Sequence, residues 1–89
     1  MITSAQMRAA RALLGIDQRQ LATMASLSLP TIQRMEASGG RVRGNIDTLM
    51  KVIEALGRAG VELIGENAAP IGVGRGVRLR ETDGRAGAA

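Results

Sequence analysis

The feature that most constrains this chain is the stretch DQRQLATMASLSLPTIQRME, residues 17–36, whose pattern predicts two short amphipathic helices around a tight turn. Asp17 is a good cap for a first helix over residues 18–25, and Ser28 is a good cap for a second over residues 29–37. The apolar positions that would face a common core are Leu21, Ala22, Ala25, Ile32 and Met35. The second helix therefore keeps an outer face free to contact a partner.

Two short helices joined by a turn of three to four residues are typical of proteins that read duplex DNA. The residues that carry this pattern are Gln18, Leu21, Ala22, Ala25, Leu27, Ser28, Ile32 and Glu36. At these positions the chain resembles the lambda-repressor/Cro-like family of helix-turn-helix proteins, also called XRE-type regulators, over about residues 3–57. Ser26 departs from the family pattern, which usually has a glycine in the turn. A left-handed serine costs of order 1 kcal/mol, which the fold can tolerate.

Further signals extend the helical region on both sides of this stretch. Thr3 and Gln6 have the spacing of a capping box, and the helix that they open should end at Gly15. Asn45 is a good cap for a last helix that should end between residues 57 and 60. Its apolar stripe consists of Ile46, Leu49, Val52, Ile53 and Leu56. The expected core consists of Met7, Leu14, Ile16, Leu21, Ile32, Met35, Leu49, Ile53 and Leu56.

The chain is therefore predicted to be mainly α, and the resemblance implies a lambda-repressor-like bundle of four to five short helices. After Gly60 the pattern changes to two short apolar runs, residues 61–64 and 77–80, which predict a small C-terminal β-hairpin. A lone hairpin is marginal in water, so we expect it to pack on the helices or to pair with a second copy. The expected parts are a helix-turn-helix DNA-binding domain (1–60), a hairpin that is a candidate dimerisation element (61–81) and a disordered tail (82–89).

Composition excludes several classes of function. The chain has no Cys and no His, which removes disulfides, the usual zinc-ligand sets, thiol nucleophiles and the commonest general base. We therefore expect no enzymatic activity, no metal, no cofactor and no small-molecule ligand. No apolar run is long enough to span a membrane, and the first residues lack the features of a signal peptide, which predicts a cytoplasmic protein. Without Phe, Tyr or Trp there is no aromatic platform for single-stranded bases, so duplex DNA is the better partner.

The positive charge is concentrated in the half that carries the helix pair. Residues 1–44 hold six Arg against Asp17 and Glu36, a balance of +4, whereas residues 45–67 hold two basic residues against four acidic ones, a balance of −2. Residues 68–89 hold four Arg against two acidic residues, a balance of +2. A basic surface suits the phosphate backbone of DNA. A modest positive charge that serves only solubility is the alternative that composition leaves open.

The resemblance implies that the second helix of the pair enters the major groove of DNA. Its base-reading positions correspond here to Leu29, Pro30, Gln33 and Arg34. Arg34 has the donors for a bidentate contact to guanine, and Gln33 has the groups for a contact to adenine or phosphate. Leu29 and Pro30 offer only carbon atoms, so we expect them at most to touch thymine methyl groups.

The resemblance also implies a contact to the DNA backbone by Gln18, and contacts to phosphate or the minor groove by Arg41 and Arg43, for which phosphate is the preferred assignment. Asn45 is a further candidate for a phosphate contact, and Thr31 is a candidate for a contact to phosphate or to a base. For Gln18 the implied role includes bracing the reading helix, and the alternative is an exposed first-turn residue. Thr31 has the alternative of being an ordinary residue of the first helical turn. Arg41 and Arg43 have the alternative of belonging to a solvated basic loop.

A structural ion pair is implied as well. The family pairs the glutamate at the position of Glu36 with an arginine of the first helix, and the matching residue here is Arg11. Removing one partner of such a pair costs about 3–5 kcal/mol if the pair is buried, and much less if it is exposed.

These residues predict a sequence-specific regulator of transcription that binds double-stranded DNA, a repressor rather than an activator, acting as a homodimer. The alternative is a protein-interaction module, such as an antitoxin or an adaptor that recruits polymerase. The apolar Leu29 and Pro30 at reading positions support this alternative. Unchanged duplex affinity after substitution of Arg34 and Arg41 would favour the interaction module.

Overall fold

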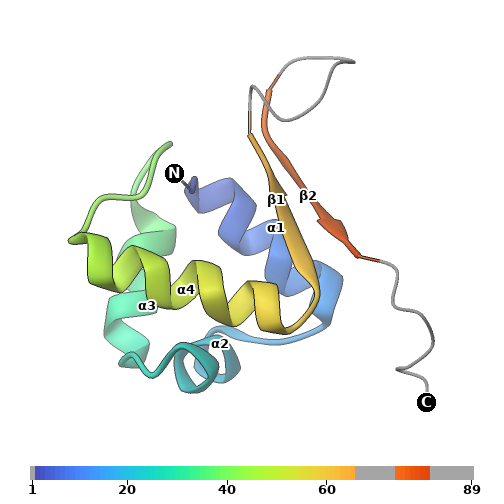
Figure 1. Cartoon of the computed structure of the whole chain (residues 1–89). Coiled ribbons are helices and arrows are strands. Elements are labelled where there is room, and N and C mark those ends of the chain that lie inside the picture. Colours follow the sequence, from blue (N-terminus) through green and yellow to red (C-terminus); the bar gives the residue numbers. More distant parts are fainter. Residues whose placement is uncertain (1, 66–73, 81–89) are drawn as a thin grey trace.

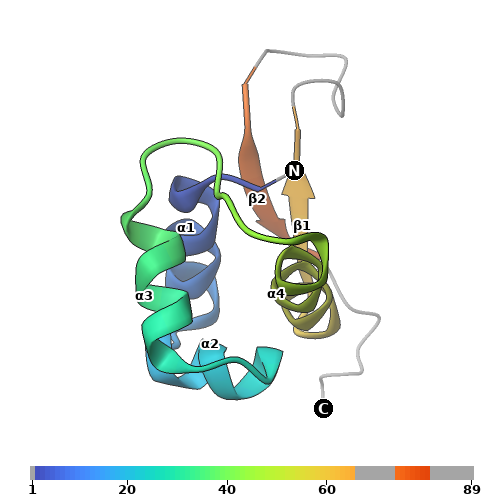
Figure 2. The ribbon, with the colours of Figure 1, turned by 90° about the vertical axis from the view of Figure 1, so that its left-hand side faces the viewer.

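The structure, a computed structural model, describes residues 2–65 and 74–80 of the 89-residue chain. Its helices and strands are α1 (Ser4–Leu14), α2 (Gln18–Ala25), α3 (Leu29–Ala37), α4 (Ile46–Arg58), β1 (Val61–Ile64) and β2 (Gly76–Leu79). The helices form a small bundle, and the antiparallel hairpin of β1 and β2 lies along α1 and α4 (Figure 1, Figure 2). The predicted mainly α fold with a C-terminal hairpin is confirmed. The expected disordered tail, residues 82–89, lies outside the described residues.

Each helix begins at the cap that the sequence predicts. The side chains that accept a hydrogen bond from the amide three residues later belong to Thr3, Asp17, Ser28 and Asn45. Thr3 and Asp17 form full capping boxes, because the side chains of Gln6 and Gln20 accept in return from the amide of the cap residue. These bonds satisfy amides that would otherwise have no partner in the helix. They are local in sequence, which is why the helix starts can be predicted without knowledge of the fold.

The turn between α2 and α3 requires a left-handed residue, and Ser26 supplies it with a φ of 57°. Gly15 takes the same conformation after α1, with a φ of 69°. We expect Ser26→Gly to raise the free energy of unfolding by about 1 kcal/mol, because glycine has no Cβ to clash in this region of φ/ψ space. Urea unfolding followed by circular dichroism measures the change.

Gly15→Ala is the matched control with the opposite sign. A Cβ added at Gly15 would meet no atom within 4 Å, so the substitution is penalised through backbone conformation alone and should lower the free energy of unfolding by about 1 kcal/mol. A Ser26→Gly variant that is no more stable than the parent chain would contradict the assigned strain.

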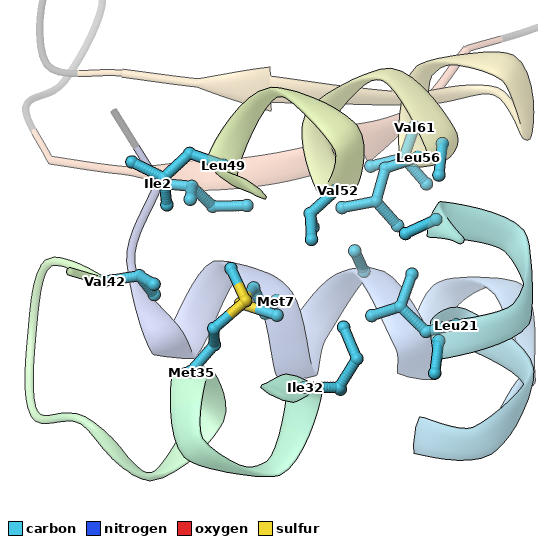
Figure 3. Packing of buried hydrophobic residues seen from close by; sticks show 14 residues of the cluster. Ile2, Met7, Leu21, Ile32, Met35, Val42, Leu49, Val52, Leu56 and Val61 are labelled. Carbon is cyan, nitrogen blue, oxygen red and sulfur yellow. The ribbon is translucent and has the colours of Figure 1, made fainter. Parts of the chain in front are cut away.

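One apolar core fills the space between the helices and the inner face of the hairpin (Figure 3). The large side chains that are fully buried are Ile2, Met7, Leu21, Ile32, Val52 and Leu56. Of the other residues predicted for the core, Met35 and Leu49 are buried. Leu14, Ile16 and Ile53 are only partly buried and pack against the margin of the core. The prediction that they belong to the core interior was therefore wrong.

Two further features of the core differ from the prediction. Ile46 is 65% exposed because it opens α4 at the outer edge of the bundle (Figure 1), so the predicted apolar stripe began too early. Ile2, Val42 and Val61 were not expected in the core, yet all three are buried. They come from the segment before α1, the loop between α3 and α4, and β1. The interior is therefore built partly by chain outside the helices.

The hairpin packs on the helices, with β1 against α4 and β2 against α1. β2 starts and ends one residue earlier than predicted, at Gly76 and Leu79. The buried side chain of Gln6 fastens the hairpin to α1, because its amide nitrogen donates to the carbonyl oxygens of Ile64, at 3.1 Å, and Gly76, at 2.9 Å. The amide oxygen of Gln6 accepts from the backbone N–H of Thr3, at 3.0 Å. One side chain thus connects the start of α1 to both strands.

Candidate nucleic-acid interface

The outer face of α3 is open to solvent and carries most of the predicted base-reading residues. Pro30, Gln33 and Arg34 are exposed, and their spacing of three and four residues places them on one side of the helix. Leu29 is half-buried at the start of the same helix. Figure 2 shows α3 on the outside of the bundle, with α1 between it and the hairpin. The fold therefore brings these residues together where a large partner has access.

The start of α3 presents carbon rather than free polar groups. The hydroxyl of Ser28 accepts from the backbone N–H of Thr31, at 3.2 Å, and the two hydroxyl oxygens share a further hydrogen bond of 2.8 Å. Thr31 is half-buried, and its hydroxyl is thus engaged in starting the helix. Because Leu29 and Pro30 are apolar, the polar side chains that α3 offers to a partner on its open face are Gln33 and Arg34.

A buried glutamate fixes α3 to the two preceding helices. Glu36 is 5% exposed, and its two carboxylate oxygens accept from Arg11 Nε, at 2.7 Å, and Arg11 Nη2, at 2.8 Å. Gln18 Nε2 donates to the same carboxylate, at 3.1 Å. The hydrogen bond from Arg11 to Glu36 is the largest cause that raises the pKa of the Arg11 guanidinium above its ordinary value. Glu36 therefore sets the orientation of the open face through α1 and α2 together.

Gln18 lies where the resemblance requires, but its side chain has a partner within the protein. The amide nitrogen is bound to Glu36, so the bracing of α3 that was implied for Gln18 is a contact of this structure. Gln18 is also the first residue of α2, and its backbone N–H is one of the donors that a helix start leaves without a helical partner. This N–H and the second hydrogen of the side-chain nitrogen are the donors that Gln18 keeps for a DNA phosphate.

Arg8 takes part in the site although the sequence analysis did not select it. Its Nη1 donates to the backbone carbonyl oxygen of Glu36, at 2.8 Å. Carbonyl groups at the end of a helix lack helical partners and favour a positive charge, so Arg8 stabilises the last turn of α3. The two residues are 28 positions apart in sequence, and no local pattern indicates such a contact.

The loop between α3 and α4 is held by the segment before α1. The backbone N–H of Val42 donates to the carbonyl oxygen of Ile2, and the N–H of Ser4 donates to the carbonyl oxygen of Gly40, both at 2.9 Å. Val42 points into the core, and Arg41 and Arg43 on either side of it are exposed, as alternation along an extended strand requires. Two guanidinium groups are thereby held on the surface by a fixed backbone.

Asn45 ends the same loop and caps α4. Its side-chain oxygen accepts from the backbone N–H of Thr48, at 2.8 Å, so the side-chain NH2 is the part of Asn45 that could donate to a phosphate. Among residues 2–65 and 74–80, no group of three or more His, Cys, Asp or Glu residues could hold a metal ion. The exposed guanidinium groups of α3 and of the loop that follows it are those of Arg34, Arg41 and Arg43.

Two short capped helices, a left-handed turn between them and an open, basic outer face on the second define a helix-turn-helix DNA-binding protein. A family model described as Helix-turn-helix matches residues 7–63, well over half of the chain. The chain belongs to this family, of the XRE type that includes Cro- and C1-like regulators. A search of curated proteins found no match. None of the helices in the described part of the chain is long and apolar enough to cross a membrane.

Proposed function

We propose that this DNA-binding protein is a sequence-specific repressor that binds double-stranded DNA as a homodimer. The observation that carries the proposal is the contrast between the two faces of α3. Its inner face is locked by the buried Glu36, whereas Gln33 and Arg34 on its outer face are exposed. A rigid helix with free polar side chains on one side suits the major groove, where base edges carry a sequence-specific pattern of donors and acceptors.

The contacts divide into base reading and positioning. Arg34 would donate twice to a guanine, and Gln33 would pair with adenine or reach a phosphate. Leu29 and Pro30 would lie against thymine methyl groups and exclude water. Positioning on the phosphate backbone falls to Arg41 and Arg43, and to those donors of Gln18, Thr31 and Asn45 that are not used within the protein.

Dimerisation and repression follow from the small size of the reading surface. One α3 helix covers a short half-site, so useful specificity requires two copies on half-sites about 34 Å apart or a whole number of turns. Occupation of a duplex is sufficient for repression, since it excludes other proteins from the same DNA. Activation would need an additional surface that recruits a partner.

Arg41→Ala tests the proposed phosphate contact. We expect it to weaken binding to every duplex by a similar factor and to reduce the slope of log affinity against log salt by about two, because the dimer loses two phosphate contacts, one from each copy, and their counterion release. Fluorescence anisotropy on specific and random duplexes, titrated at several salt concentrations, measures both quantities.

Lys51→Ala is the control for the change in net charge. Lys51 is exposed in the middle of α4, outside α3 and the loop that follows it and outside β2. The control should bind like the parent chain. Equal losses in the two variants would mean that Arg41 acts through net charge alone and makes no phosphate contact.

A second candidate function is a protein-interaction module that uses the start of α3. The observation that favours it is the carbon surface of Leu29 and Pro30, whose neighbouring hydroxyls of Ser28 and Thr31 are bound to each other. This candidate predicts no preference for any duplex over random competitor. The anisotropy titration above therefore separates the two functions.

A further inference from the structure

The outer edge of β2 has backbone groups that no described residue satisfies. The hairpin pairs Val61 with Leu79 and Leu63 with Val77, and the N–H of Arg80 donates to the carbonyl oxygen of Gly60 across the two strands. Along an antiparallel strand, successive residues direct their N–H and C=O groups alternately toward the paired strand and away from it. Because Arg80 is bonded toward β1, the N–H and C=O groups of Val77 and Leu79 point away from β1. Within residues 2–65 and 74–80, nothing outside the hairpin bonds to them.

Apolar side chains border this edge. Leu13 and Leu79 are 42% and 44% exposed. Gln6 contacts the start of β2, and α1 and β2 run in the same direction (Figure 1). Leu13 lies about 10 Å beyond Gln6 along the axis of α1, and Leu79 lies about 10 Å beyond Gly76 along β2. The two leucines are therefore at the same height, with the exposed Ala9 and Ala12 of α1 beside them.

The guanidinium groups on either side of Leu79 are held by partners within the chain. Arg78 of β2 is paired with Glu62, at 2.8 Å, and Arg80 Nη2 donates to the carbonyl oxygen of Gly57, at 2.8 Å. The outer edge of β1 is less suited to a second copy, because it lies beside α4, which presents charged residues. These exposed residues include Asp47, Lys51, Glu54 and Arg58. An edge with outward backbone donors and acceptors and exposed leucines can pair with an identical edge.

We propose that a second copy of this chain docks on the surface formed by the outer edge of β2 with Leu13 and Leu79, here called the β2-edge surface. The two β2 strands pair antiparallel about a two-fold axis and join the hairpins into one four-stranded sheet. This inference rests on the proposed homodimer and assigns the surface that forms it. An isologous contact of this kind closes after two copies, and it removes the marginal two-stranded edge.

The charge pattern of β2 selects the register of this pairing. With Val77 on the two-fold axis, Arg78 of one copy lies opposite Gly76 of the other, so no arginine faces an arginine. With Leu79 on the axis, Arg78 would face Arg80, and like charges directly opposite destabilise a strand pair. The first register is therefore the favoured one, and it leaves the outer face of α3 uncovered because α1 lies between α3 and the hairpin (Figure 2).

Sedimentation equilibrium without DNA tests the β2-edge surface. The parent chain should be a dimer, and a Leu13→Lys/Leu79→Lys double variant should have a dissociation constant raised at least about 100-fold, because each substitution acts twice in a symmetric contact. The matched control is Ile46→Lys, which changes the remaining large, exposed apolar residue of the described chain, 65% exposed and at the start of α4. This control should dimerise like the parent chain.

Three results would overturn the inference: a monomeric parent chain at high micromolar concentration, a double variant that dimerises as tightly as the parent, or an equal loss in Ile46→Lys. If the double variant unfolds, Leu13→Lys alone gives the same test, since lysine is well tolerated on an exposed helix face. Because DNA is absent, these outcomes do not depend on base reading. Loss of duplex preference in an intact dimer would count against the proposed function instead.

Discussion

Glu36→Ala is expected to lower the free energy of unfolding by about 3–5 kcal/mol, a large part of the stability of a domain of this size. The reason is that Glu36 is 5% exposed and binds Arg11 through both oxygens, at 2.7 and 2.8 Å, and Gln18 at 3.1 Å. Alanine would leave the guanidinium of Arg11, whose side chain is 21% exposed, without its counter-charge. Urea unfolding of the parent chain and the variant gives the difference directly.

Glu62→Ala provides the comparison for an exposed pair. Its ion pair with Arg78 has the same length, 2.8 Å, but the two side chains are 62% and 44% exposed, so its removal should cost no more than about 1 kcal/mol. A loss for Glu36→Ala as small as that for Glu62→Ala would show that burial does not strengthen the Arg11–Glu36 pair. The role of Glu36 in orienting α3 would then have to be abandoned.

The helix starts were predictable because their signals are local. A cap and its partner are three residues apart, and the conformation of Ser26 follows from the tight turn that the flanking helices impose. The same reasoning applies to the outer face of α3, since a spacing of three and four residues places Gln33 and Arg34 together on any helix. The family resemblance added the register, that is, which side of that helix should meet DNA.

The contacts that hold the site in place were not predictable in the same way. The bond from Arg8 to the last turn of α3 joins residues 28 positions apart, and the bond from Gln6 to Gly76 spans 70 positions. Val42 looked like a loop residue, yet its backbone pairing with Ile2 buries it and turns Arg41 and Arg43 outward. Such contacts depend on how elements pack, and the side chains involved have no distinctive spacing in the sequence.

The type of a residue does not show whether its polar groups are already bonded within the protein. Thr31 and Ser28 have the chemistry of phosphate ligands, but the structure uses their hydroxyls to begin α3. Asn45 and Gln18 are similarly engaged, with Thr48 and Glu36. Fewer side-chain groups are therefore left for the phosphate backbone than the sequence indicated. Of the predicted base-reading residues, Leu29 is half-buried and Pro30 is apolar, so Arg34, which can donate twice to one base, is the residue whose loss should matter most for specificity.

Arg34→Ala is accordingly expected to weaken binding to the preferred duplex by about 1–3 kcal/mol, roughly 5- to 150-fold, for each half-site that the dimer reads, while affinity for random duplex falls much less. Arg34 is exposed, and a bidentate contact to guanine is made only when that base is present. The preferred duplex is first obtained by selection from a random library with the parent chain, and both affinities are then measured by anisotropy at one salt concentration.

Arg41→Ala is the matched comparison, because it removes the same charge from the same surface. The ratio of specific to random affinity should collapse in Arg34→Ala and stay constant in Arg41→Ala, since phosphate contacts carry no sequence information. Repeating the selection with Arg34→Ala should lose the preference at one base pair of each half-site and keep it elsewhere. If both variants reduce the two affinities by one common factor, Arg34 lies on the DNA backbone and α3 reads bases through Gln33, Leu29 and Pro30 alone.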